Sequence, residues 1–243
     1  MLGTIVNALA IIIGGSVGLF IKGGLKQKYK DIIMQTLALS VMFVGLQSAL
    51  SGLLNENVEP ILYILSLVIG SAIGEKIDIE LRLNKLGDSI QKKMGQKAEE
   101  SNIALGFVTA SLVFCVGTMA ILGSLESGIN GNHSTLFAKS VLDGTFSTIY
   151  ASTLGIGVLF SAVAVFLYQG AITVAATFIE PYLTVDMIRE MSIVGGIMIF
   201  SLGLNMMEIK KIKVGNMLPA ILIPVIYYLP FVQNLIEKIS GLF

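Results

Sequence analysis

Long apolar runs separated by short charged connections constrain this chain more than any other feature of its sequence. An α-helix needs about 20 apolar residues to cross the hydrocarbon core of a membrane. The fifth run is the most polar, because it carries Lys139 and Asp143. The pattern predicts an all-α, polytopic transmembrane helical bundle of about 7–8 spans, one of them broken or polar. The runs fall at about 2–21, 32–51, 60–74, 102–123, 136–152, 158–180, 187–207 and 214–235.

The amino-acid composition supports the same conclusion. Hydrophobic residues make up 54% of the 243 residues and charged residues only 13%, and the mean hydropathy is +0.84. Soluble domains average about 25% charged residues, because a surface in water carries many ionisable side chains. We therefore interpret residues 1–243 as a single transmembrane domain in contact with the lipid bilayer, without a separate soluble domain.

Motifs that the chain lacks argue against several functional classes. One cysteine, Cys115, and one histidine, His133, give neither a disulfide within the chain nor a metal-ligand spacing. The sequence has no P-loop, HExxH or GxSxG motif, so we do not expect an enzyme, a cofactor or a bound metal. Basic residues form no patch outside the connections between the runs, which argues against a nucleic-acid partner.

The distribution of basic residues predicts the orientation of the chain. Thirteen of the 16 Lys and Arg residues lie in three connections, at 22–31, 76–101 and 208–213. Connections rich in Lys and Arg stay in the cytoplasm, so the N-terminus is predicted to lie outside. The connections near 124–135 and 181–186 then both lie outside. Two connections on the same side must be joined by an even number of membrane crossings, and the run 158–180 supplies one. The run 136–152 must therefore also cross the membrane, or re-enter it with a break elsewhere.

An internal similarity indicates a repeat. The run 32–50 resembles 187–207, and both end in Gly-Leu followed by a side-chain amide, at Gln47 and Asn205. The predicted orientation gives the two runs opposite directions, which is the pattern of inverted-topology repeats in transporters. We place the repeat halves at 1–76 and 158–243, joined by a cytoplasmic amphipathic helix at 76–101 and central spans at 102–157.

The polar residues of the fifth run are the candidate site. Lys139 and Asp143 lie four residues apart, and this spacing places them on one face of a helix. Ionisable residues within a span are costly and usually mark a path for ions or substrate. An interfacial ion pair whose lysine reaches outward is the alternative interpretation, and amides in spans often only bond neighbouring helices. The site residues that we predict besides this pair are Ser140, Thr145, Ser147, Asn7, Asn205 and Asn216.

The chain resembles a bacterial family of uncharacterised multi-pass membrane proteins, the YdfK/YqgA-like family, which has a domain of unknown function. The resemblance implies the bacterial plasma membrane and transporter-like character, and it supplies no substrate. This chain has Thr118 where the family carries proline, so the resemblance does not support a proline-made break in the fourth run. The matching stretches are Gly3-Thr4-Ile5-Val6-Asn7, Met119-Ala120-Ile121-Leu122-Gly123-Ser124, Lys139-Ser140 through Asp143-Gly144, Gln169-Gly170 and Lys213-Val214-Gly215-Asn216-Met217-Leu218-Pro219.

These features favour transport of a small solute. We expect a secondary transporter of a small polar solute or ion, coupled to H⁺ or Na⁺, because few charges line the predicted interior. An ion channel and a non-transporting structural or scaffold membrane protein are the alternatives. A channel would place its path on the axis of a homo-oligomer, whereas a transporter would bind its solute near the midplane of each protomer.

Overall fold

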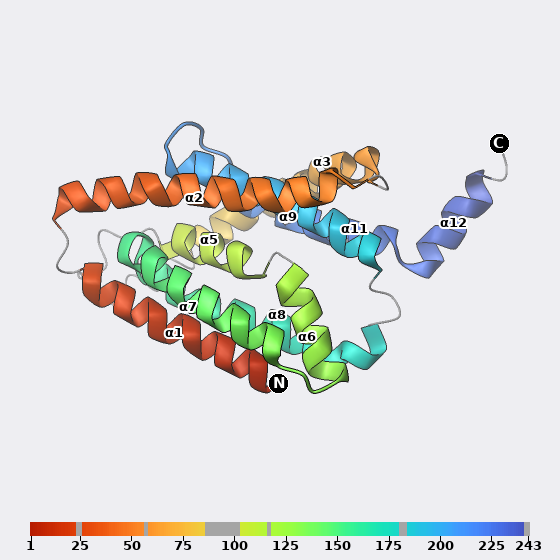
Figure 1. Cartoon of the computed structure of the whole chain (residues 1–243). Coiled ribbons are helices and arrows are strands. Elements are labelled where there is room, and N and C mark those ends of the chain that lie inside the picture. The colour runs from red at the N-terminus through yellow and green to blue at the C-terminus, as the bar shows by residue number, and fades with distance from the viewer. Residues whose placement is uncertain (23–25, 56–57, 86–102, 116–117, 180–183, 241–243) are drawn as a thin grey trace.

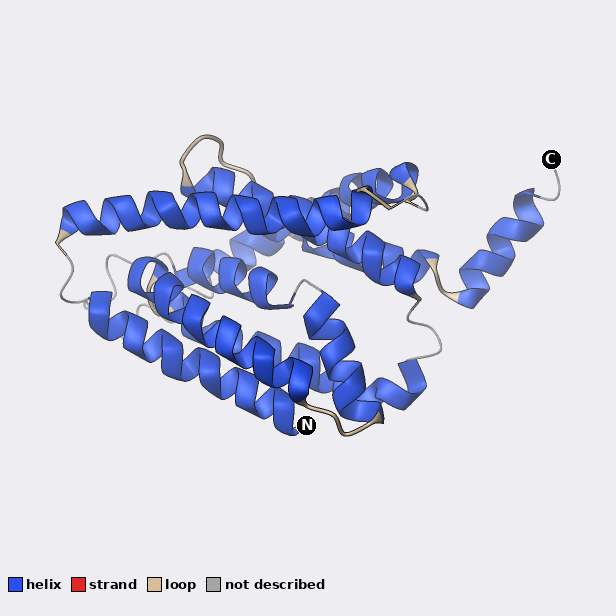
Figure 2. Ribbon diagram, viewed as in Figure 1, coloured by secondary structure: helices blue, strands red, loops and turns tan. Residues whose placement is uncertain are grey.

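The computed structural model is built of helices that lie roughly side by side (Figures 1 and 2). It describes residues 1–22, 26–55, 58–85, 103–115, 118–179 and 184–240. This arrangement confirms the predicted all-α class. The helices are α1 (Leu2–Lys22), α2 (Gln27–Leu53), α3 (Pro60–Ile77), α5 (Ile103–Cys115), α6 (Thr118–Ile129), α7 (Ser134–Leu154), α8 (Gly157–Ile179), α9 (Val185–Met206), α10 (Val214–Met217), the 3₁₀ helix η3 (Leu218–Ile221), α11 (Leu222–Tyr227) and α12 (Pro230–Ser240).

The helices form two groups that share one hydrophobic core. In the first group, which we call the α1 group, α1 packs against α7 and α8, and α5 and α6 cover α8. In the second, the α2 group, α2 packs against α9, and α3 packs against α10, η3 and α11. Few helices touch across the boundary, chiefly α2 with α7 and α5 with α9. The C-terminal helix α12 extends away from both groups (Figure 1).

Helices α1 and α7 run parallel and approach closely. Gly3 lies against Leu136 near the start of both helices, and Gly18 lies against Thr148 near their ends. A side chain at Gly14 would overlap the backbone carbonyl of Gly144. Small residues allow helix backbones in membranes to come this close, so the glycines of α1 determine which helix it packs against.

Three further pairs of helices run antiparallel. Gly45 of α2 lies against Gly196 of α9, whereas Gly203, further along α9, lies against the earlier residue Ala38. Helices α3 and α10 to α11 are related in the same way, and α1 also runs antiparallel to α8. Each helix of the first predicted repeat half therefore packs antiparallel against its counterpart in the second half.

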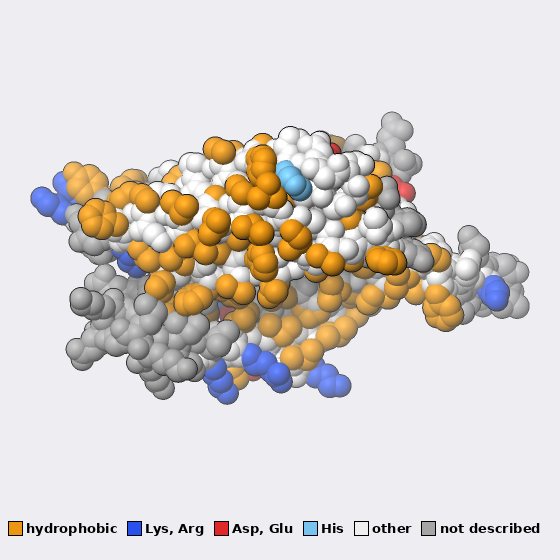
Figure 3. All heavy atoms as spheres, turned by 90° about the horizontal axis from the view of Figure 1, so that it is seen from below, with side chains coloured by type: hydrophobic (Ala, Val, Ile, Leu, Met, Phe, Trp, Pro, Cys, Tyr) orange, Lys and Arg blue, Asp and Glu red, His pale blue; other side chains and the backbone are white. Residues whose placement is uncertain are grey.

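These directions define two ends of the bundle. One end, the N-terminal end, holds the N-terminus and the connections that follow α2, α6 and α8. The other, the basic end, holds the connections that follow α1, α3, α7 and α9, which carry most of the lysines. Figure 3 shows hydrophobic side chains spread over one face of the molecule, with Lys and Arg side chains toward its edges. An apolar face of this extent suits contact with lipid acyl chains.

Five of the described helices are long and apolar enough to cross a membrane, and the pair α5 and α6 makes a sixth if it is one span. Those two helices meet at 59°. Helix α7 does not reach the hydropathy of a span, yet it is continuous over 21 residues and follows α1 along its length. It therefore lies beside α1 over most of its length, and it is not broken.

The predicted eighth run, 214–235, is not one helix. It is divided into α10, η3 and α11, and a separate helix begins at Pro230. Proline lacks a backbone N–H and clashes with the preceding turn, so Pro219, Pro224 and Pro230 explain these divisions. Of the predicted helix at 76–101, residues 79–85 are helical and 86–101 lie outside the described residues.

Candidate functional site

An ion pair lies in the interior of the α1 group, halfway along α7. The Lys139 Nζ atom is 2.9 Å from Asp143 Oδ1 and 2.8 Å from Oδ2. Lys139 is 7% exposed and Asp143 4%, so neither side chain reaches outward to the edge of the membrane. The four-residue spacing on a continuous helix produces this contact, as the sequence predicts. The alternative of an outward-reaching, interfacial lysine is wrong.

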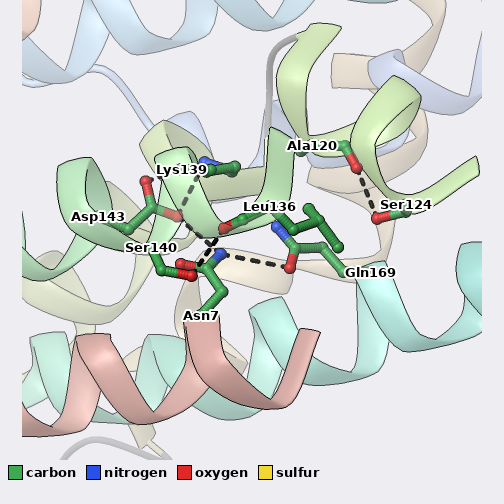
Figure 4. A network of polar contacts seen from close by, with 8 residues as sticks. All are labelled: Asn7, Ala120, Ser124, Leu136, Lys139, Ser140, Asp143 and Gln169. Atoms are coloured by element: carbon green, nitrogen blue, oxygen red, sulfur yellow. Dashed lines mark hydrogen bonds and ion pairs between the residues drawn. The ribbon is translucent and has the colours of Figure 1, made fainter. Parts of the chain in front are cut away.

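Two amides from other helices complete a buried network around Asp143 (Figure 4). The Asn7 side-chain N–H of α1 donates to Asp143 Oδ2 at 2.9 Å and to Gln169 Oε1 of α8 at 3.3 Å. Both amide side chains are fully buried. Three helices thus contribute to one polar centre, in which the Asp143 carboxyl group accepts bonds from a lysine and an amide.

The network leaves two polar atoms without a partner. Asn7 Oδ1 and Gln169 Nε2 are buried and have no hydrogen-bond partner among the described residues. Most buried polar atoms in proteins are paired, because an unpaired one costs about 1–3 kcal/mol. One acceptor and one donor beside the Asp143 carboxyl group are therefore left without a partner among the described residues.

The two serines on this face of α7 bond to backbone. Ser147 Oγ donates to the carbonyl of Ile11 at 2.8 Å and so joins α7 to α1. Ser140 Oγ donates to the carbonyl of Leu136 at 2.7 Å within its own helix. Both side chains are buried next to the network, and their hydroxyl protons are already used. They shape the site and fix the position of α7.

Three predicted site residues lie elsewhere. Thr145 is exposed on the other side of α7, where it bonds its own helix. Asn205 bonds the backbone of Ile212 in both directions, at 2.7 Å each, and stabilises the turn after α9. Their expected place beside Asp143 is wrong, because helix rotation and the end of α9 direct them away from it.

Asn216, the third of these residues, belongs to a separate cluster at the basic end. Its side-chain N–H donates to Glu75 at 2.6 Å, and its carbonyl accepts from the backbone N–H of Glu80 at 2.7 Å. Lys213 forms an ion pair with Glu75. This cluster joins α3 to α10. Nearby, a cavity of about 410 Å³ opens between the two helix groups, lined by Leu105 and Val108 of α5 and by Leu202 and Asn205 of α9, among others.

Two buried polar residues, Gln169 and Glu190, are not among the predicted site residues. Gln169 lies in the middle of an apolar run, and Glu190 lies within the seventh run beside Arg189. In the sequence each is a polar residue within an apolar run, and this pattern by itself does not show whether the side chain faces protein or lipid. No group of three or more His, Cys, Asp or Glu side chains able to hold a metal ion occurs in the described part of the chain.

Comparison with known proteins identifies the family. The model of the family described as "Protein of unknown function (DUF554)" matches residues 2–229. The chain belongs to the DUF554 family. It is 41% identical to "Uncharacterized membrane protein YdfK" of Bacillus subtilis (strain 168) over 224 residues, which cover 92% of this chain and 94% of that protein.

A second relative is more distant. The chain is 29% identical to "Uncharacterized protein YqgA" of Escherichia coli (strain K12) over 227 residues, which cover 92% of this chain and 94% of that protein. No solved structure matches the chain significantly. The family and the apolar helices make this a membrane protein.

Proposed function

We propose that this DUF554 protein is a secondary transporter of a small polar solute or ion in the bacterial plasma membrane. The observation that carries the proposal is the buried network of Asp143, Lys139, Asn7 and Gln169. An ion pair at this depth is costly to bury, and ionisable groups within spans usually mark a substrate or ion path. The unpaired atoms of the two amides offer a solute one donor and one acceptor.

The division of the helices into two groups supports a transport cycle. Alternating access in many transporters is a rocking of one helix group against another around a central site. The α1 group and the α2 group share few helix contacts, and the cavity of about 410 Å³ at the basic end lies between them. A small rotation between the groups is the movement that we propose for opening and closing a route to Asp143.

We also propose that the basic end lies in the cytoplasm and that the first and last three spans form an inverted repeat. The antiparallel pairing of α1 with α8, α2 with α9 and α3 with α10 to α11 supports the repeat, because a two-fold axis in the membrane plane relates such pairs. In an inverted repeat the two halves have the same fold but opposite orientations in the membrane, which suits a protein that opens to both sides.

Transport by purified protein in liposomes tests the proposal. A panel of amino acids, organic acids and inorganic cations is offered to the wild type, to Asp143→Asn and to Thr145→Val. We expect at least tenfold slower uptake by Asp143→Asn and unchanged uptake by Thr145→Val, the matched control on the lipid-facing side of α7. Equal uptake by both variants refutes the role of Asp143. Uptake at the rate of a pore, together with a measurable electrical conductance, favours an ion channel instead of a transporter.

A further inference from the structure

A second buried carboxyl group lies in the α2 group. Glu190 is the sixth residue of α9 and its side chain is fully buried. Its Oε1 atom accepts a hydrogen bond from the backbone N–H of Glu59 at 3.2 Å. Its Oε2 atom is buried and has no hydrogen-bond partner among the described residues. Nothing in the site around Asp143 uses this group.

No charged neighbour forms an ion pair with Glu190 in the described part of the chain. Arg189, the next residue, forms its ion pair with Asp186 at 2.7 Å and donates to Asn55 at 3.4 Å. From α3, the facing group is Glu59, an acid like Glu190 itself. From α11, the Tyr227 hydroxyl donates to Glu59 Oε2 at 2.9 Å, and Tyr228 follows it in the chain. The groups packed around Glu190 are therefore acidic or phenolic, apart from an arginine that is already paired.

This arrangement differs from that of Asp143. Lys139 neutralises Asp143 directly, at 2.8–2.9 Å, whereas no ion pair to Glu190 occurs in the described part of the chain. An ionised carboxylate without a cation partner is expensive to bury, and such a group usually becomes neutral by taking up a proton. A neutral carboxylic acid still accepts the bond from Glu59 through its carbonyl oxygen.

We propose that Glu190 is a proton-binding site and that, within the transport function proposed above, it carries the coupling proton. A proton needs one oxygen atom, whereas a hard metal cation needs several oxygen ligands. Glu190 offers a single free carboxyl oxygen, which suits H⁺ and not Na⁺. Glu59 is exposed at the N-terminal end and contacts Glu190, so it provides a short route for exchange of the proton with water.

Infrared spectroscopy, which compares the purified wild type with each variant, tests proton binding directly. A protonated carboxyl group has a carbonyl stretch that an ionised one lacks. We expect this signal at neutral pH in the wild type, its loss in Glu190→Gln, and its retention in Asp143→Asn and in Asp78→Asn, a control acid at the basic end. Glutamine keeps the size and the carbonyl acceptor, and circular dichroism checks that each variant is folded. A wild type without the signal, or a Glu190→Gln variant that keeps it, overturns the proposal.

Liposomes with an imposed pH gradient test the coupling. We expect the wild type to accumulate solute several-fold when the gradient is present, and Glu190→Gln to exchange solute without accumulating it. Accumulation that ignores the gradient overturns the coupling role of Glu190 but leaves transport through the Asp143 site intact. If the wild type transports no member of the panel, the proposed transport function fails, and the infrared result still decides whether Glu190 binds a proton.

Discussion

Replacing Lys139 by methionine is the most direct test of the buried ion pair. Methionine keeps much of the length and apolar stem of lysine but removes the charge. Asp143 then retains one hydrogen bond, from Asn7 at 2.9 Å, and loses two contacts of 2.8–2.9 Å with the ammonium group. We therefore expect a large loss of stability that comes almost entirely from the unpaired carboxyl group.

Two estimates agree on the size of this loss. Breaking a buried ion pair by removing one partner costs about 3–5 kcal/mol. Alternatively, Asp143 takes a proton from water. An aspartic acid in water has a pKa of about 3.9, so protonating it at pH 7 costs about three pH units, or about 4 kcal/mol. The variant adopts whichever of these two states has the lower free energy. We therefore expect Lys139→Met to lose about 3–4 kcal/mol of stability at pH 7.

The pH dependence separates these routes. If the folded variant binds a proton at Asp143 that the unfolded chain does not bind at pH 7, stability must rise as the pH falls. The deficit of Lys139→Met should then shrink by about 1.4 kcal/mol per pH unit between pH 7 and pH 5. Denaturant unfolding in detergent micelles, followed by circular dichroism, measures it.

A double variant completes the test. Lys139→Met with Asp143→Asn has no charge to bury, and asparagine can still accept the bond from Asn7. We expect it to be more stable at pH 7 than Lys139→Met alone, by about 2 kcal/mol or more. A double variant that is less stable than the single one refutes the reasoning that the unpaired carboxyl group causes the loss. A loss of stability that does not change with pH shows instead that Asp143 stays ionised in the folded variant.

Three further predictions follow from the packing. Gly14→Leu should lose about 1–3 kcal/mol of stability, because the side chain overlaps the Gly144 carbonyl; lipid-facing Ile13→Leu should be neutral in the same unfolding assay. In a Cys115→Ser background, Asn55→Cys and Lys210→Cys should label from opposite sides of the membrane, and labelling from one side contradicts the topology. An experimental structure should superpose α1 to α3 on α8 to α11 by a rotation about an in-plane axis; unrelated packing of the two triplets rules out the repeat.

The sequence determines where the helices lie along the chain and one contact of the site. The apolar runs determine which segments leave water, because each is long enough to bury its backbone in a helix. The four-residue spacing of Lys139 and Asp143 determines their contact, since residues at i and i+4 share a face. Prolines after residue 218 also mark where the last run divides.

The tertiary structure alone decided which polar residues meet. Asn7 and Gln169 lie 136 and 26 residues from Asp143 along the chain, and no local pattern brings them together. Thr145 faces lipid and Asn216 bonds Glu75, although the sequence predicts both as site residues just as it predicts Asn7. The physical reason is that a membrane helix is apolar on the side that faces lipid and on the side that faces protein. Hydropathy therefore identifies the helices, and only the close contacts of their small residues determine which face of each one turns inward.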